Sequence, residues 1–144
     1  MHTSLLLNFR ECDCKIYISE ANIQMWKILV STEFEQWHQT LTEREKIALS
    51  NIVGLLENRG PVLGRPHVDR VEGSRFHNMK ELRLQNGIRV FFAFDPRRIA
   101  VLLIGGNKSE ADSSTPNWNR FYEYMIPIAD QIFAEHLLTI GDDK

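Results

Sequence analysis

The chain has 144 residues, of which 43% are apolar and 25% are charged; this is the composition of one globular domain and excludes a disordered or fibrous protein. No apolar run is long enough to span a membrane. The net charge of −2 hides a basic middle: residues 59–108 carry ten Lys or Arg against four Asp or Glu, while residues 1–58 and 109–144 have net charges of −3 and −5. Charge alone supports two explanations of this basic segment equally well. It contacts a polyanion or an acidic partner, or it neutralises the acidic helices on either side of it.

Residues 1–24 form an N-terminal extension whose order the sequence leaves open, with one possible strand at Lys15–Ile18. Its apolar start is too short for a signal peptide, so we expect a cytoplasmic protein. Both cysteines, Cys12 and Cys14, lie in this extension, and no second group of ligands has the spacing of a metal site. We therefore expect reduced thiols, no metal and no cofactor.

A domain begins at Met25 with a strand over residues 25–30, and two helices follow it. Each helix opens with a capping box, in which a threonine precedes a glutamate by three residues. The two pairs are Thr32 with Glu35 and Thr42 with Glu45. The second helix is expected to end at Gly60, which Pro61 follows, and the two helices are predicted to form a hairpin.

Residues 61–78 form a loop rich in glycine, proline and basic residues, and three strands follow it. The strands are predicted at Met79–Leu84, Ile88–Phe94 and Arg98–Ile104. The short turns between them contain Asn86-Gly87 and Asp95-Pro96, which indicates an antiparallel meander.

The end of the chain is predicted to hold a helix that Thr115-Pro116 opens. Its apolar stripe is Phe121, Met125, Ile128 and Ile132. Pro127 must kink this helix or split it in two, and His136 is expected to be exposed on its polar face. The element order β-α-α-β-β-β-α indicates an α+β fold, in which the N-terminal helical hairpin and the C-terminal helix pack on one face of an antiparallel sheet. We expect this domain to span residues 25–139, with a tail at 140–144.

The first turn of the meander decides which side chains share a face of the sheet. A three-residue loop at 85–87, with Gly87 in the left-handed conformation, puts the apolar side chains of both strands on one face, whereas a two-residue loop divides them. The three-residue register places Arg83 opposite Arg89 on the exposed face, and the third strand brings Lys108 to the same end. Like charges opposed on a sheet repel unless an anion lies between them, so these cations predict a phosphate site. The alternative is that the acidic residues of the same face, Glu81 and Asp95, neutralise the arginines.

Several blocks of this sequence resemble the RelE/HigB toxins of type II toxin–antitoxin modules, and most of all the phage-derived HigB-like subgroup. The blocks are Asn78–Arg83, Arg89–Arg98 and Val101–Lys108, and Gly60–Pro66 and Met125–Asp130 fit the same subgroup. The resemblance implies the RelE/ParE-like fold. It also implies a metal-independent endoribonuclease that cuts mRNA on the ribosome, using the RNA 2′-hydroxyl as nucleophile and leaving a 2′,3′-cyclic phosphate.

The resemblance further implies a set of catalytic residues. These are Lys80, Arg83, Arg89, Lys108 and Tyr122. In this interpretation Arg83 and Arg89 neutralise the scissile phosphate, and Lys108 stabilises the transition state or protonates the leaving oxygen. The base is Lys80 or a histidine, His77 or His67, although the register places Lys80 on the core-facing side of its strand. The candidates for RNA binding are Arg65, Arg75, His77, Phe91 and Arg98.

The resemblance implies a helix-turn-helix antitoxin that covers the basic face, with operator DNA contacted only through the antitoxin. Two other functions remain open: a non-enzymatic inhibitor of DNA gyrase like the ParE branch, and a degenerate module that only binds its antitoxin. The alignment of Arg83, Arg89 and Lys108 on one face favours the nuclease, because a protein that only binds does not need it. We predict an mRNA-cleaving toxin.

Overall fold

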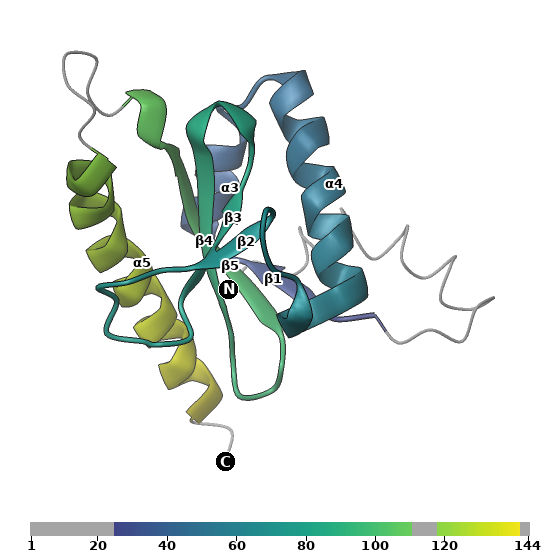
Figure 1. The fold of residues 1–144 in the computed structure, drawn as a ribbon. Coiled ribbons are helices and arrows are strands. Elements are labelled where there is room, and N and C mark those ends of the chain that lie inside the picture. The colour runs from purple at the N-terminus through teal and green to yellow at the C-terminus, as the bar shows by residue number, and fades with distance from the viewer. Residues whose placement is uncertain (1–24, 111–117, 142–144) are drawn as a thin grey trace.

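A five-stranded sheet forms the centre of the domain (Figure 1). The computed structural model describes residues 25–110 and 118–141. The strand order is β1-β5-β4-β3-β2, and neighbouring strands run antiparallel except for β1 and β5, which run parallel. The strands are β1 (Ile28–Val30), β2 (Val68–Arg70), β3 (Lys80–Arg83), β4 (Ile88–Phe94) and β5 (Ala100–Asn107). The predicted α+β class and the meander of β3, β4 and β5 are confirmed.

Both edges of the sheet differ from the prediction. β2 is an additional strand within the segment expected to be a loop; it has three residues, too few for an alternating hydrophobic pattern to identify it. β1, expected in an antiparallel sheet, pairs in parallel with β5. Two helices separate β1 from the meander, so no tight turn forces it into an antiparallel arrangement.

The turn between β3 and β4 has the predicted three-residue form. Residues 85–87 connect the strands, and Asn86 and Gly87 have φ angles of 65° and 84°. Both residues occupy the left-handed region, which Asn and Gly tolerate best. The register that follows places Arg83 opposite Arg89, as predicted.

The helical hairpin is also confirmed. It consists of α3 (Thr32–His38) and α4 (Glu43–Arg59). Thr42 and Glu45 form the predicted capping box, in which each side chain accepts a hydrogen bond from the backbone N–H of the other residue. Gly60, with a φ of 62°, ends α4 at the predicted position.

The predicted capping box of α3 is wrong by one residue. Ser31, not Thr32, caps the helix, and its Oγ accepts a hydrogen bond from the backbone N–H of Phe34 at 2.9 Å. The same hydroxyl donates a hydrogen bond to the carbonyl oxygen of Leu103 on β5. This second bond ties the helix start to the sheet, which explains why the residue nearest to the strand takes the cap position.

The C-terminal helix α5 (Trp118–Gly141) is one continuous element although Pro127 lies inside it. The predicted split is therefore not found; Pro127 is exposed, and Met125 and Ala129 on either side of it are packed against the sheet. The expected start at Thr115-Pro116 lies outside the described residues, as do residues 1–24 with their possible strand and both cysteines. No helix in the described ranges is both long and apolar enough to cross a membrane.

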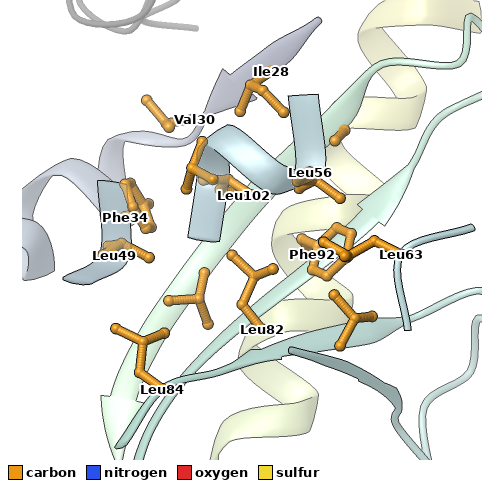
Figure 2. Close-up of a cluster of buried hydrophobic side chains, with 14 of the residues drawn as sticks. Ile28, Val30, Phe34, Leu49, Leu56, Leu63, Leu82, Leu84, Phe92 and Leu102 are labelled. Atoms are coloured by element: carbon orange, nitrogen blue, oxygen red, sulfur yellow. The ribbon is translucent and has the colours of Figure 1, made fainter. Parts of the chain in front are cut away.

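The helices cover both faces of the sheet, whereas the prediction placed all of them on one face. Figure 1 shows α4 and α5 on opposite sides. One core lies between the sheet and the hairpin and includes Leu49, Leu56, Leu82, Val90, Phe92 and Leu102 (Figure 2). The other core lies between the sheet and α5 and includes Met79, Phe91, Ala93, Leu103, Phe121 and Met125. β4 is apolar on both faces, which is typical of a strand that is covered twice.

His136 is buried and not exposed as expected. The residue is 3% exposed, and its Nε2 lies 2.8 Å from Oδ2 of Asp95, which follows β4. Asp95 also accepts hydrogen bonds from the backbone N–H groups of Arg97 and Ile99 and forms an ion pair with the Arg97 guanidinium at 3.1 Å. Asp95 is thus occupied at the β4–β5 turn and does not neutralise the arginines at the other end of the sheet.

Two consecutive glycines bring both helical layers close to β5. A Cβ atom at Gly105 would lie 2.4 Å from the ring of Trp37 on α3, and a Cβ atom at Gly106 would lie 3.0 Å from the ring of Phe121 on α5. Successive residues of a strand point to opposite faces, so each glycine receives an aromatic ring from a different layer. The close approach of Trp37 therefore requires glycine at position 105, and a side chain at position 106 would need the Phe121 ring to shift.

Candidate active site

Side chains from β3, β4, α5 and the end of β5 meet at one end of the sheet. We call Arg83, Arg89 and Lys108 the basic cluster. Arg83 and Arg89 lie opposite each other on β3 and β4, and Lys108 follows β5 with its Nζ 6.0 Å from the centre of the Tyr122 ring. The structure thus brings together four of the five residues predicted to be catalytic.

A carboxylate lies between these cations. Oε1 of Glu81 accepts a hydrogen bond from the Tyr122 hydroxyl at 2.8 Å and lies 3.9 Å from Nε of Arg89. Oε2 of Glu81 lies 3.8 Å from Nε of Arg83. Glu81 therefore neutralises the arginines in part, as the alternative interpretation expected, and its side chain is buried at 5% exposure. The face that carries these groups is covered by α5 and is not the open face that the sequence predicted.

Arg89 is fixed by the turn beside it. The residue is 7% exposed, and its Nη1 donates hydrogen bonds to the carbonyl oxygens of Leu84 and Ile88 at 3.0 and 2.9 Å. Its Nε has no hydrogen-bond partner among the described residues. This atom forms an ion pair with Oε1 of Glu81 at 3.9 Å. A buried guanidinium with two fixed bonds holds its charge at a defined point, which is what binding of a phosphate requires.

Arg83 is held more loosely and reaches further out. Its side chain is one-third exposed, and Nη1 lies 3.4 Å from Oδ2 of Asp69 on the neighbouring strand β2. The same carboxylate oxygen lies 3.1 Å from the exposed guanidinium of Arg65. Arg83 can therefore exchange Asp69 for an incoming anion at little cost, because ion pairs of this exposure are weak.

The surroundings change the acidity of three groups in this site. Burial raises the pKa of Glu81, although the Tyr122 hydroxyl and the nearby cations oppose this effect. Burial and the Glu81 carboxylate raise the pKa of Tyr122 to about 12, so its hydroxyl stays protonated at neutral pH and acts as a hydrogen-bond donor. Burial, followed by the charges of Arg89 and Arg83, lowers the pKa of Lys108. Lys108 is thus a stronger acid than an ordinary lysine, which suits a proton donor to a leaving oxygen.

Lys80, the fifth residue of the predicted catalytic set, lies elsewhere. The register puts it on the hairpin side of the sheet, as the sequence indicated, and its Nζ donates a hydrogen bond to the carbonyl oxygen of Pro61 at 3.2 Å. Nζ also lies 6.0 Å from the centre of the Phe94 ring. Burial, and then the charge of Arg70, lowers the pKa of Lys80. The structure does not bring it to the basic cluster.

The predicted RNA-binding residues are dispersed. Phe91 is fully buried against Phe121 and Tyr122 under α5, so its ring is not accessible to a base. Arg98 lies at the other end of β4, stacked over Trp26 at 4.7 Å. The remaining three flank β2: Arg65 precedes it, and Arg75 and His77 lie in the loop that follows it.

Two hollows lie beside the basic cluster. The first, of about 840 Å³, lies between the first half of α4, the segment before β2 and the β3–β4 turn; we call it the α4 groove. Arg83 and Arg89 line it together with Arg44, Arg65 and His67. The second, of about 610 Å³, lies along α5 and is lined by Arg75, Tyr122 and Asp130 among others.

Two residues of this region were missed by sequence reasoning. Arg44 lies in the acidic first part of the chain, where a count of charge per segment conceals it. Glu81 was expected only to neutralise the arginines, and its bond to Tyr122 joins residues 41 positions apart. The period-two pattern of β3 does place Glu81 on the face of Arg83, and that is the one signal that could have identified it.

Comparison with known proteins identifies relatives of this chain. The family model of the phage-derived Gp49-like proteins (DUF891) matches residues 36–134. The Mycobacterium tuberculosis protein named Putative toxin HigB3 is 46% identical over 105 residues, which cover 72% of this chain and 87% of that protein. Putative toxin HigB2 of the same organism is 45% identical over 96 residues, which cover 64% of this chain and 45% of that protein.

Solved structures share the fold at low sequence identity. A chain of the archaeal RelE–RelB complex of Pyrococcus horikoshii matches with a TM-score of 0.50 and 17% identity, and the match covers 60% of this chain and 98% of that one. A chain of the Escherichia coli DinJ–YafQ toxin–antitoxin complex has a TM-score of 0.50 and 14% identity and covers 62% and 98%. The gyrase-inhibitor alternative is not favoured by these relatives. The chain belongs to the phage-derived, HigB-like Gp49 family of RelE/HigB toxins, which are the mRNA-cleaving components of toxin–antitoxin systems.

Proposed function

We propose that the basic cluster is the site at which this toxin cleaves mRNA, with the ribosome presenting the substrate. The observation that carries the proposal is the pair Arg83 and Arg89, opposed across two strands with Lys108 at the same strand end. Two guanidiniums and an ammonium on rigid strands can stabilise the extra negative charge that a phosphate gains in a pentavalent transition state. A substrate on translating ribosomes requires that the toxin act in the cytoplasm.

In the proposed reaction the RNA 2′-hydroxyl loses its proton to a base and attacks the adjacent phosphorus. The P–O5′ bond then breaks, a 2′,3′-cyclic phosphate forms, and the O5′ oxygen takes a proton from Lys108. Of the three bases that the sequence suggested, we propose His67. It lines the α4 groove with both arginines, and its carbonyl oxygen accepts a hydrogen bond from the Arg83 N–H at 2.8 Å.

The remaining residues of the site have supporting roles in this proposal. Arg89 and Arg83 bind the non-bridging phosphate oxygens, and Tyr122 donates a hydrogen bond from a hydroxyl that stays protonated at neutral pH. Glu81 is a positioning residue, because it orients the Tyr122 hydroxyl and holds both guanidiniums in place. The partner that restrains the toxin is a cognate antitoxin of the helix-turn-helix class, which alone contacts operator DNA.

Expression of the chain without an antitoxin tests this function. We expect growth arrest with discrete new mRNA ends by primer extension, and 2′,3′-cyclic phosphates at the upstream fragments. Arg83→Ala should abolish both effects, while Arg59→Ala, at the far end of α4, should leave them unchanged. Arrest with intact mRNA and trapped gyrase–DNA complexes would contradict the proposal.

A further inference from the structure

The loop between β2 and β3 is fastened to α5 by the carboxylate of Asp130 (Figure 1). Asp130 is 7% exposed, and both of its oxygens are used. Oδ1 accepts a hydrogen bond from the Ser74 hydroxyl, and Oδ2 accepts one from the backbone N–H of Arg75 at 3.0 Å. The Ser74 oxygen in turn accepts a hydrogen bond from the backbone N–H of Phe76 at 2.9 Å. A buried carboxylate bonded to two consecutive residues fixes the loop backbone at the point where the Arg75 side chain begins.

The side chain of Arg75 is exposed and not committed to the fold. Its guanidinium lies 5.3 Å from the centre of the Phe76 ring, which packs edge-on against Phe133 of α5 at 5.0 Å. In the part of the chain that the structure describes, no carboxylate forms an ion pair with this guanidinium. Asp130 thus bonds to the backbone of Arg75 and leaves the charge of its side chain available to an external anion.

Arg75 lines the second hollow beside the basic cluster, which we call the α5 hollow. Tyr122 lines it as well, and its hydroxyl bonds to Glu81, which forms ion pairs with both Arg83 and Arg89. One tyrosine side chain therefore connects the hollow with the cations that we propose to hold the scissile phosphate. An RNA strand with that phosphate on the basic cluster can reach the α5 hollow with a neighbouring nucleotide.

The lining of the α5 hollow suits a single nucleotide. Ile126 and Pro127 give it an apolar surface, against which the flat face of a base can pack. The exposed carboxylates of Glu72 and Glu123 can accept hydrogen bonds from the N–H groups of a base. Arg75 is the one cation among the described residues that line the hollow, so there is a place for one phosphate and not for a longer run of RNA backbone.

We propose that the α5 hollow binds the nucleotide next to the scissile phosphate, with the phosphate of that nucleotide on Arg75, and that Asp130 positions Arg75 for this contact. Asp130 does not touch the substrate; it acts by holding the loop. Release of the loop lets the Arg75 guanidinium move away from Tyr122, so RNA binding weakens although the basic cluster is intact. This inference rests on the proposed function, because a flanking nucleotide presupposes a phosphate on the basic cluster.

The test measures binding of a decanucleotide RNA of mixed sequence to the full chain by fluorescence anisotropy. The RNA carries 2′-O-methyl groups, so that it cannot be cleaved. Arg75→Ala should weaken binding about tenfold, because one charged hydrogen bond is lost. It should also reduce the slope of log Kd against log salt by about 0.7, the contribution of one phosphate contact with a single strand. Asp130→Asn should change both quantities in the same direction, and so should Ser74→Ala, which removes one bond of the carboxylate and keeps Asp130 itself.

A double-mutant cycle separates positioning from a general effect on the fold. In the Arg75→Ala background, Asp130→Asn should change neither Kd nor the salt slope further, because the side chain that it positions is gone. Two matched controls should bind RNA like the wild type. Glu135→Gln alters another hydrogen-bonded carboxylate of α5 that does not line the hollow, and Arg59→Ala removes an exposed cation at the end of α4.

Two results overturn the inference: Arg75→Ala binds RNA like the wild type, or Asp130→Asn weakens binding by the same factor in both backgrounds, which would assign it to the fold alone. In the first case, binding of an oligolysine peptide that Glu72→Gln and Glu123→Gln weaken would identify the hollow as a surface for a basic protein. If the variants behave as expected but the wild type leaves ribosome-bound mRNA intact, the nucleotide site stands and the proposed function fails. If the wild type cleaves mRNA and Arg75→Ala binds RNA normally, the proposed function stands and this inference fails.

Discussion

The two faces of the central sheet are built from different chemistry. The hairpin face is packed with aliphatic and aromatic side chains, and the charged groups buried in the domain gather mainly on the α5 face. On that face α5 is attached by three polar side chains along its length: Tyr122 to Glu81, Asp130 to the loop after β2, and His136 to Asp95. Both faces thus bury apolar area, and the α5 face in addition holds charges at fixed points. The substitutions below should separate these roles.

A substitution in the core on the hairpin face should cause the largest loss of stability. Phe92 is fully buried in that core, and Phe92→Ala should lower the free energy of unfolding by about 3–5 kcal/mol. Urea unfolding measures this change. Cleavage per folded molecule should stay normal, because the side chain lies across the sheet from the basic cluster; a folded yet inactive variant would show that the two faces are not separate.

Arg89 should behave as a structural residue of the α5 face as well as a phosphate ligand. Its removal leaves the buried Glu81 without one of its two arginine partners and two turn carbonyls without this donor. Loss of one member of a buried ion pair costs about 3–5 kcal/mol, so Arg89→Ala should melt at a clearly lower temperature. A variant as stable as the wild type would contradict this role.

Substitution of Arg83 should lower the cleavage activity and leave the stability of the fold nearly unchanged. Its ion pairs are partly exposed, so Arg83→Ala should change the melting temperature little. The lost contact with the transition state should reduce the cleavage rate by a free energy of about 2.7–4 kcal/mol. Single-turnover cleavage of a ribosome-bound mRNA measures the rate. Variants that lose stability and activity in proportion would assign Arg83 to the fold alone.

A substitution near the C-terminal end of α5 should have a smaller effect on stability, and this effect should depend on pH. Burial raises the pKa of Asp95, but hydrogen bonds from His136, Ile99 and Arg97 outweigh burial and lower it below its usual 3.8. The ionised carboxylate therefore stabilises the fold above about pH 4, and this contribution is lost as the pH falls through the lowered value.

His136→Ala removes the first of these bonds. It should cost about 1–3 kcal/mol at pH 7, and the cost should decrease as the pH falls through the lowered pKa of Asp95. Thermal melts of the two proteins across this pH range measure the difference. A cost that does not change with pH would show that His136 acts through packing against Phe133 and not through Asp95.

Much of this architecture follows from local sequence. The position of Gly87 and the alternation of apolar residues permit only one register, so the opposition of Arg83 and Arg89 was predictable. The burial of His136 was not, because its partner Asp95 is 41 positions away and a helix pattern alone gives no sign of it. The sequence did not predict that α5 covers the second face of the sheet. Phe91 and Ala93, which pack under α5, alternate along β4 with residues that pack under the helical hairpin, so the strand shows no separate second apolar face.

The glycine pair of β5 has an evolutionary consequence. A side chain at position 105 would overlap the ring of Trp37, and a side chain at position 106 would press against the ring of Phe121. A larger side chain at either glycine is acceptable only after its aromatic neighbour has become smaller, so each pair has to change together. The members of each pair, 68 and 15 residues apart in sequence, should covary among relatives of this toxin even though they lie outside the basic cluster.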